Sequence, residues 1–138
     1  MADGDHASAQ SARTPGANRA GPGEYVFELA KLNHILGGPA YSTANGTCVE
    51  GDRMMVALMR MPAGTGAEAH SHPNEQWLYI LEGTFLANVG GKQVRAPAGS
   101  VLYIPSNTVH DGRASPDADV VFFTVKDTSH SLHGIKAA

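Results

Sequence analysis

Short apolar runs separated by glycine- and proline-rich turn signals make up most of the chain from Thr47 onward. Thr84 to Val89 and Lys92 to Ala96 flank the pair Gly90-Gly91, and a long apolar run extends from Asp119 to Lys126. Two residues between two strands make a tight hairpin, and glycine permits the positive φ angles that such a turn requires. Short strands with turns about every 8–12 residues predict an all-β barrel or sandwich.

The run Arg53 to Met61 is a predicted strand with two largely apolar faces, and it follows a shorter strand at Thr47-Cys48-Val49. We expect Asn45-Gly46 to form the turn before them. Apolar residues on both faces indicate that one face lines a barrel interior and the other packs against a second sheet or subunit. If the face that carries Arg60 is the inner one, Arg60 can neutralise a substrate carboxylate; otherwise it reaches solvent at the strand end.

The N-terminal residues 1–22 are mostly small or polar and include six alanines and three glycines, too little apolar surface to build a core. Such a segment cannot offset its ordering entropy, so we expect a disordered arm, able to order against a partner subunit. The folded domain is predicted to span residues 23–138. It would begin with an entry strand at Tyr25-Val26-Phe27, followed by a short turn or helix. The C-terminal segment with His130 and His133 is expected to be a solvated tail.

Length and charge narrow the class of protein. A chain of 138 residues predicts one domain, and a net charge of −3 without a basic stripe argues against a nucleic-acid partner. The single cysteine, Cys48, excludes an intramolecular disulfide and fits a reducing, cytoplasmic compartment. No apolar run approaches the roughly 18 residues that a membrane span needs.

Three histidines carry the strongest chemical signal in the chain. His70 and His72 are two residues apart, so on a strand their imidazoles lie on the same face, as two ligands of a transition metal do. His110 follows another short strand and a proline turn. Three histidines on short strands predict a metal held inside a small barrel. At the next strand start, only one of Glu75 and Gln76 can share the inward face.

Two segments resemble the motifs of the cupin superfamily. The stretch 64–83 is similar to the first motif, and Gly83 sets a register that places Gln76 where the family most often has glutamate. The stretch 99–114 is similar to the second motif and matches it at Gly99, Pro105 and His110. It departs from the motif at two positions, with Asn107 in place of a glycine and Ala114 in place of an asparagine. The resemblance implies a single cupin-type β-barrel, also described as a jelly roll or double-stranded β-helix.

The resemblance also implies a metal site formed by His70, His72, Gln76 and His110, with Glu75 as the carboxylate alternative to Gln76. The expected cofactor is one divalent transition metal, iron first, with Mn, Ni, Zn or Cu as alternatives. Three imidazoles and an amide are all neutral, so the full charge of the dication would remain. Such a site favours anionic ligands such as enolates or carboxylates.

We therefore expect a mononuclear metal-dependent enzyme that acts on a small anionic or enolisable molecule, with a dioxygenase as the first hypothesis. The alternatives are a non-redox lyase or isomerase, and a small-molecule binding or sensor module without catalysis. No side chain is a clear general base. The candidates are a hydroxide on the metal or a substrate oxygen, and, more weakly, Tyr41, Tyr103 and Asp111, with Arg60 as a carboxylate partner.

The predicted substrate pocket is apolar, which suits a small molecule better than a sugar that needs many polar partners. Its expected lining is Leu78, Ile80, Phe85, Leu102 and Phe123. Ala87 is a further candidate, and so is Phe122, because the inward face of the last strand is left open.

An apolar stripe on the opposite face of the strand after Gln76 predicts a homodimer. Trp77, Tyr79 and Leu81 would point outward, and a soluble monomer seldom exposes such a stripe. Burial against a second copy requires only one self-complementary patch. The methionines at 55, 59 and 61 could extend this outer face. The competing interpretation is that the segment Tyr25 to Leu36 covers the stripe.

Overall fold

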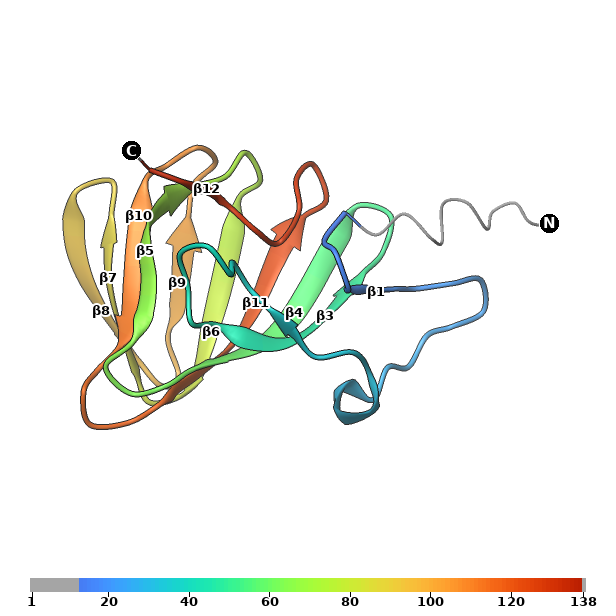
Figure 1. Cartoon of the computed structure of the whole chain (residues 1–138), viewed down its shortest axis with the longest axis horizontal. Helices are drawn as coiled ribbons and strands as arrows, with labels where there is room; N and C mark the ends of the chain where they lie inside the picture. The colour runs from blue at the N-terminus through green and yellow to red at the C-terminus, as the bar shows by residue number, and fades with distance from the viewer. Residues whose placement is uncertain (1–12, 138) are drawn as a thin grey trace.

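The computed structural model describes residues 13–137, which form a jelly-roll β-barrel of two facing sheets (Figure 1). One sheet has the strand order β1-β3-β4-β11-β6-β9, with β2 paired to β3, and the other has the order β12-β5-β10-β7-β8. Helical structure among the described residues is confined to a 3-10 turn, η1 (Leu29–Lys31). The strands are β1 (Asn18–Arg19), β2 (Ile35–Leu36), β3 (Asn45–Glu50), β4 (Met54–Met61), β5 (Gly66–Ser71), β6 (Gln76–Glu82), β7 (Thr84–Val89), β8 (Lys92–Pro97), β9 (Val101–Ile104), β10 (His110–Ala114), β11 (Val120–Asp127) and β12 (Ile135–Lys136). The predicted all-β barrel is confirmed.

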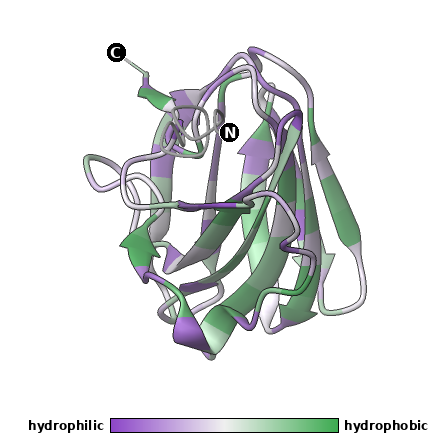
Figure 2. Cartoon of the chain, turned by 90° about the vertical axis from the view of Figure 1, so that its right-hand side faces the viewer, coloured by the Kyte–Doolittle hydropathy of each residue, from purple (hydrophilic) through white to green (hydrophobic). Residues whose placement is uncertain are grey.

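Strand β4 directs its odd-numbered residues into the barrel. Met55, Met59 and Met61 are buried there, and Figure 2 shows that the most hydrophobic segments of the chain lie on the strands. The prediction that these methionines extend an outer apolar face is therefore wrong. The sequence does not show which alternate residues of β4 point into the barrel, because both faces of the strand are apolar. Strand β4 lies between β3 and β11, inside its sheet.

Glycine is required at two different kinds of position. Gly90 and Gly91 form the predicted hairpin between β7 and β8, with φ angles of 58° and 85°. Asn45-Gly46, in contrast, is not a turn but the start of β3. A Cβ atom at Gly46 would lie 1.9 Å from the carbonyl oxygen of Leu58 on the adjacent strand. Gly46 therefore permits a close approach of two strands, and the turn prediction is corrected.

Part of the predicted disordered arm belongs to the folded structure. The buried carboxylate of Glu50 accepts hydrogen bonds from the backbone N–H groups of Arg13, at 2.7 Å, and Thr14, at 3.0 Å. Strand β1 then pairs in parallel with β3. The prediction of disorder is thus corrected for residues 13–22, which gain backbone pairing rather than apolar burial; residues 1–12 lie outside the described part of the chain.

The next segment also differs from the prediction. Tyr25 and Val26 are exposed and form no strand, so the expected entry strand is wrong. The chain instead makes η1 and then β2, which pairs with β3 through Ile35 and Leu36.

The C-terminal segment packs across one end of the barrel instead of remaining a solvated tail. Strand β12 pairs with β5, so that Lys136 lies opposite His70. Leu132 is buried, and its backbone N–H donates a 2.7 Å hydrogen bond to the hydroxyl of Thr14. The two terminal segments of the described chain therefore meet at Thr14 and Leu132, and the C-terminal one continues to the strand that carries His70. The polar composition of these segments does not predict their packing, because the contacts are backbone hydrogen bonds and one buried leucine.

Candidate metal centre

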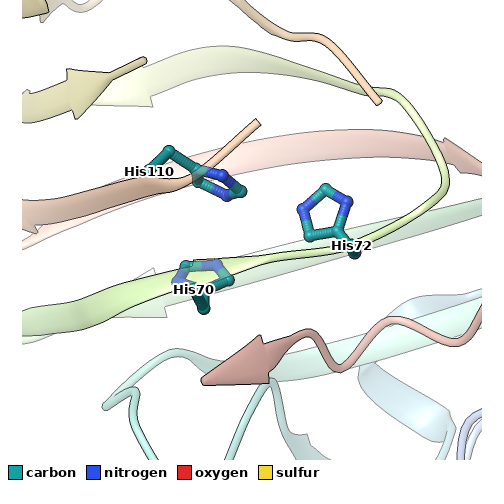
Figure 3. Close-up of side chains that lie close together, drawn as sticks. All are labelled: His70, His72 and His110. Atoms are coloured by element: carbon teal, nitrogen blue, oxygen red, sulfur yellow. The ribbon is translucent and has the colours of Figure 1, made fainter. Parts of the chain in front are cut away.

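The predicted clustering of the three histidines is confirmed. His70 on β5 is the cross-strand partner of His110 on β10, and His72 follows directly after β5. One ring nitrogen from each of the three lies within 4.8 Å of the others, and Figure 3 shows the three rings close together. All three side chains are buried. We refer to His70, His72 and His110 as the histidine site.

Backbone carbonyls fix the tautomer of each ring in the histidine site. Every Nδ1 lies 2.7–2.8 Å from a carbonyl oxygen two positions along the chain. A carbonyl oxygen only accepts hydrogen bonds, so each Nδ1 must carry the proton and donate it. In a neutral imidazole the other nitrogen, Nε2, then presents a lone pair. The three acceptors are the carbonyl groups of Glu68, Asn74 and Thr108.

Burial keeps these rings neutral. Removal from water disfavours the imidazolium form and lowers the pKa of His70 to about 4 and that of His72 to about 3. Burial likewise lowers the pKa of His110. The positive charge of Lys126 adds to the lowering in all three cases. At neutral pH the site therefore offers three deprotonated Nε2 atoms, which is the state that binds a metal.

Gln76, rather than Glu75, faces the histidines. The Gln76 amide nitrogen donates a 2.8 Å hydrogen bond to the hydroxyl oxygen of Thr124, whose own proton is donated to the carbonyl of Trp77 at 2.8 Å. This chain fixes the orientation of the amide, so Oε1 points toward His72 and lies 3.1 Å from its Nε2. Glu75 is exposed and accepts a hydrogen bond from the hydroxyl of Tyr103.

The donor set fits a first-row divalent metal. His72 Nε2 and Gln76 Oε1 lie close together as two lone-pair atoms, and a cation between such atoms replaces their repulsion with attraction. Three imidazole nitrogens and an amide oxygen suit borderline ions such as Fe, Co, Ni, Cu or Zn. The backbone carbonyls that hold the three Nδ1 atoms are the type of partner that orients metal-bound histidines.

A cavity of about 60 Å³ opens beside the site, and we call it the histidine cavity. His70, His110 and Gln76 line it together with an apolar wall. This space accommodates several water molecules or a small organic molecule. The ring of Tyr41, 4.3 Å from that of His70, also borders it. The apolar wall includes Leu78, Phe85, Ile104 and Phe122.

The predicted pocket residues are only partly placed at this cavity. Leu78 and Phe85 line it, whereas Ile80 is buried in the core and Leu102 packs against that core without lining the cavity. Phe123 borders a groove on the outer face of the sheet, so its assignment to the pocket is corrected. Val120, Val121, Phe122 and Phe123 place apolar side chains on both faces of β11, so the sequence does not show which phenylalanine points inward.

Two of the candidate catalytic side chains, Tyr103 and Arg60, lie away from the histidine cavity. Tyr103 is partly exposed on the outward face of β9, with its ring 4.6 Å from that of Trp77. Arg60 forms a 3.1 Å ion pair with Asp119 at the surface. Neither lines the histidine cavity, and both assignments are corrected. Alternation along each strand turns these side chains toward solvent, since their neighbours Ile104 and Met59 point inward.

Asp111 borders the histidine cavity, but its carboxylate accepts hydrogen bonds from the backbone N–H of Asn88, at 2.9 Å, and from the Asn88 amide. A register irregularity between His110 and Gly112 accompanies this arrangement. Hydrogen bonds from the side chain and the backbone of Asn88 therefore already occupy the Asp111 carboxylate.

Sequence reasoning overlooked Lys126, which lines the histidine cavity although it ends an apolar run. Burial lowers its pKa to about 7. Its ammonium nitrogen donates a 2.7 Å hydrogen bond to the carbonyl of Leu132. Lys126 lies two residues after Thr124 and four after Phe122, so it shares their face of the strand, and that face is the inward one in the structure.

The barrel and its central histidines define the class of protein, and the chain belongs to the cupin family. The family model described as Cupin domain matches residues 57–126, about half of the chain, and includes the histidine site. A search of curated proteins found no match. Among the described residues, no helix has the length and apolar character needed to cross a bilayer.

Solved cupin structures resemble the fold. A cupin protein from Bacteroides fragilis is 27% identical, with a TM-score of 0.52 over 55% of this chain and 66% of that one. A cupin-like protein from Thermotoga maritima is 23% identical, with a TM-score of 0.58 over 77% and 83% of the two chains. KdgF from Halomonas sp. is 18% identical, with a TM-score of 0.62 over 75% and 93%. Similarity at this level describes the fold, and the chemistry has to be argued from the site.

Proposed function

We propose that the protein is a mononuclear metal-dependent enzyme acting on a small anionic or enolisable molecule, with dioxygenase activity as the first reaction class. The observation that carries this proposal is the neutral donor set, in which three Nε2 lone pairs and the oriented oxygen of Gln76 converge beside a small cavity. No carboxylate donor among the described residues joins this set.

A divalent metal held by these donors would act as a Lewis acid toward an oxygen of the substrate. The absence of a carboxylate from the donor set leaves the cation's charge uncompensated, so an anionic substrate gains more from binding there than a neutral one. The chain supplies orientation through the hydrogen bond from Gln76 to Thr124. The apolar wall that includes Phe85 and Phe122 limits the water that can accompany a bound molecule.

Dioxygenase activity is the preferred class because an enolised substrate is itself electron-rich. The site lacks the two-histidine, one-carboxylate donor set of many oxygen-activating iron enzymes. Reaction with dioxygen would therefore depend on electron density supplied by the bound organic anion. The cavity admits such a substrate between its apolar wall and the histidine side of the site.

A non-redox lyase or isomerase is the second candidate, and the same donor set favours it. Three imidazoles and an amide bind zinc or nickel as readily as iron, so the ligands do not select a redox-active ion. A Lewis acid that stabilises an enolate is sufficient for proton transfer or for elimination next to a carbonyl group.

Oxygen-electrode measurements separate the two classes. Protein loaded with ferrous iron is assayed with small 1,3-diketones and 2-oxo acids, and the same compounds are tested with the zinc form under argon. The proposal predicts oxygen uptake that depends on the organic compound and disappears in the His70→Ala, His72→Ala double variant. Turnover by the zinc form without oxygen, together with no oxygen uptake by the iron form, would instead identify a lyase or isomerase.

A further inference from the structure

Lys126 is a buried cation without an acidic partner. Its side chain is only 3% exposed, yet none of the ion pairs found between residues 13 and 137 includes it. An ammonium group has three N–H donors, and the hydrogen bond to the carbonyl of Leu132 uses one of them. Buried donors normally find acceptors, and Lys126 lines a cavity, so its remaining donors point to an acceptor that enters from outside.

Asp127 is an acidic residue whose charge acts on Lys126, but it is only partly buried, and its carboxylate accepts hydrogen bonds from the backbone N–H groups of Glu75 and Ser129. Glu50 is fully buried and accepts the backbone N–H groups of Arg13 and Thr14. Asp111 accepts from Asn88. Cys48 is a closer neighbour of the lysine charge, but burial raises the pKa of its thiol to about 12 and keeps it uncharged. None of these groups forms an ion pair with Lys126.

Lys126 also lies next to the metal-binding groups. It is the cross-strand partner of Gln76, and directly opposed residues in an antiparallel pair have Cβ atoms about 4.5–5.5 Å apart. Lys126, Gln76, His70 and His110 line the same cavity of about 60 Å³. A ligand that fills so small a space contacts both the ammonium group and the metal-binding side of the cavity.

We propose that Lys126 is the anion-recognition residue of this site, and that its ammonium group binds the carboxylate of a small acid whose neighbouring oxygen faces the metal centre. The preferred ligand class is thus a short 2-oxo or 2-hydroxy carboxylate. This inference rests on the proposed function and narrows its substrate class. An anion placed between the ammonium group and a metal cation also relieves the repulsion between these two positive groups.

A purely structural role would be different. In that case Lys126 only anchors the C-terminal segment through Leu132, and any side chain that donates to this carbonyl would replace it. Lys126→Gln retains an N–H donor but removes the charge, whereas Lys126→Met removes both and keeps similar length and volume. Lys92→Met is the matched control because Lys92 is exposed at the β7–β8 hairpin, away from the cavity lining.

The test uses cobalt(II)-loaded protein and follows its visible absorption during titration with pyruvate and with the neutral analogue pyruvamide. In the wild-type protein and Lys92→Met, pyruvate is expected to bind more tightly than pyruvamide. Lys126→Met and Lys126→Gln should each weaken pyruvate binding at least about tenfold, the loss of one charge-assisted hydrogen bond. Pyruvamide affinity and cobalt stoichiometry should remain within about twofold, because the donors of the metal site are unchanged.

Three results would overturn the inference and leave the metal site intact: equal affinity of wild-type protein for pyruvate and pyruvamide, undiminished pyruvate binding in Lys126→Met, or undiminished binding in Lys126→Gln. If Lys126→Met does not fold, Lys126→Gln and the wild-type comparison still decide. Failure of the wild-type protein to bind cobalt would overturn this inference and the proposed function together.

Discussion

The Nε2 atom of His72 and the Oε1 atom of Gln76 lie 3.1 Å apart, and neither atom carries a hydrogen to donate to the other. The His72 proton is on Nδ1, where the carbonyl of Asn74 accepts it, and the Gln76 amide hydrogens are on the nitrogen that faces Thr124. Two lone pairs held this close by separate hydrogen-bond networks form half of a cation site. The turn after β5 thus orients His72, and Thr124 on the inward face of β11 orients Gln76.

Gln76→Glu tests the consequence of a neutral donor set. The variant should keep its metal, and bind it at least as tightly, because a carboxylate adds Coulomb attraction. Binding of pyruvate to the metal-loaded protein should weaken several-fold, because the new negative charge repels the anion. Metal analysis and ligand titration measure the two effects. Gln76→Ala should instead lower metal affinity. If both variants leave metal and pyruvate affinity unchanged, Gln76 does not belong to the site.

Thr124→Val tests the role of the hydroxyl that orients Gln76. Valine has nearly the same shape but cannot accept the hydrogen bond from the amide, so the amide can rotate and turn its nitrogen toward the metal. Loss of such an outer-shell partner typically lowers metal affinity about 10–100-fold. Competition with a chromogenic chelator measures the change, and Thr108→Val is the control because Thr108 is partly exposed and contributes its backbone carbonyl rather than its hydroxyl to His110. Unchanged affinity in Thr124→Val would contradict the orientation argument.

The metal-free protein should lose stability as the pH falls from about 6.5 toward 4.5. In the folded state the pKa is about 4 for His70 and about 3 for His72, whereas the ordinary value is 6.5. Between these values the unfolded state binds more protons, so acidification favours unfolding. Each buried histidine adds a slope of up to about 1.4 kcal/mol per pH unit. The stabilising contribution is thus complete above pH 6.5 and decreases as the pH falls through this window.

Urea unfolding in the presence of excess chelator, at several pH values in this window, measures that slope. Lys126, with a pKa of about 7, is mostly protonated in both states over this range, so its contribution is smaller than that of the histidines and fades as the pH falls. His70→Gln should reduce the slope, while His34→Gln should not, because His34 is exposed. A flat stability profile for the wild-type protein would show that the histidines are not held neutral by burial.

We expect a homodimer formed by the outward face of β6 and β9. The apolar side chains there are 39–61% exposed, and Trp77 and Tyr103 are in ring contact. The described chain leaves this face uncovered, so the competing idea that residues 25–36 cover it is wrong. Light scattering should give about twice the chain mass of 14.4 kDa. The residues of this face are Trp77, Tyr79, Leu81, Val101 and Tyr103.

Trp77→Asp should shift the mass toward that of one chain, because a carboxylate would be buried at the centre of the interface. Tyr25→Asp is the control, since Tyr25 is also exposed but lies outside β6 and β9. A wild-type mass near 14.4 kDa at micromolar concentrations would exclude the dimer.

The sequence predicted those features whose spacing has a single structural meaning. His70 and His72 share a face because they are two residues apart on a strand, and Gly90-Gly91 has the length and backbone freedom of a hairpin turn. The inward face could not be predicted in β4 or in the first half of β11, because both faces of these segments carry apolar side chains. Lys126 was overlooked for a related reason, since a lysine at the end of an apolar run normally marks a return to solvent.

The placement of the two terminal segments could not be predicted from the sequence either, because it depends on contacts between residues far apart in the chain. Glu50 binds the backbone of residues 13 and 14, and Thr14 binds the backbone of Leu132. Any polar segment can make such backbone hydrogen bonds, so composition carries no signal for them.

Metal content tests the central claim most directly. Purified protein, dialysed after incubation with ferrous, cobalt or zinc ions, should retain about one equivalent of metal per chain by elemental mass spectrometry. The His70→Ala, His72→Ala double variant should retain none while keeping its β-sheet circular dichroism, and His34→Ala should retain the wild-type amount. Stoichiometric metal in the folded double variant, or none in the wild-type protein, would contradict the assignment of the histidine site.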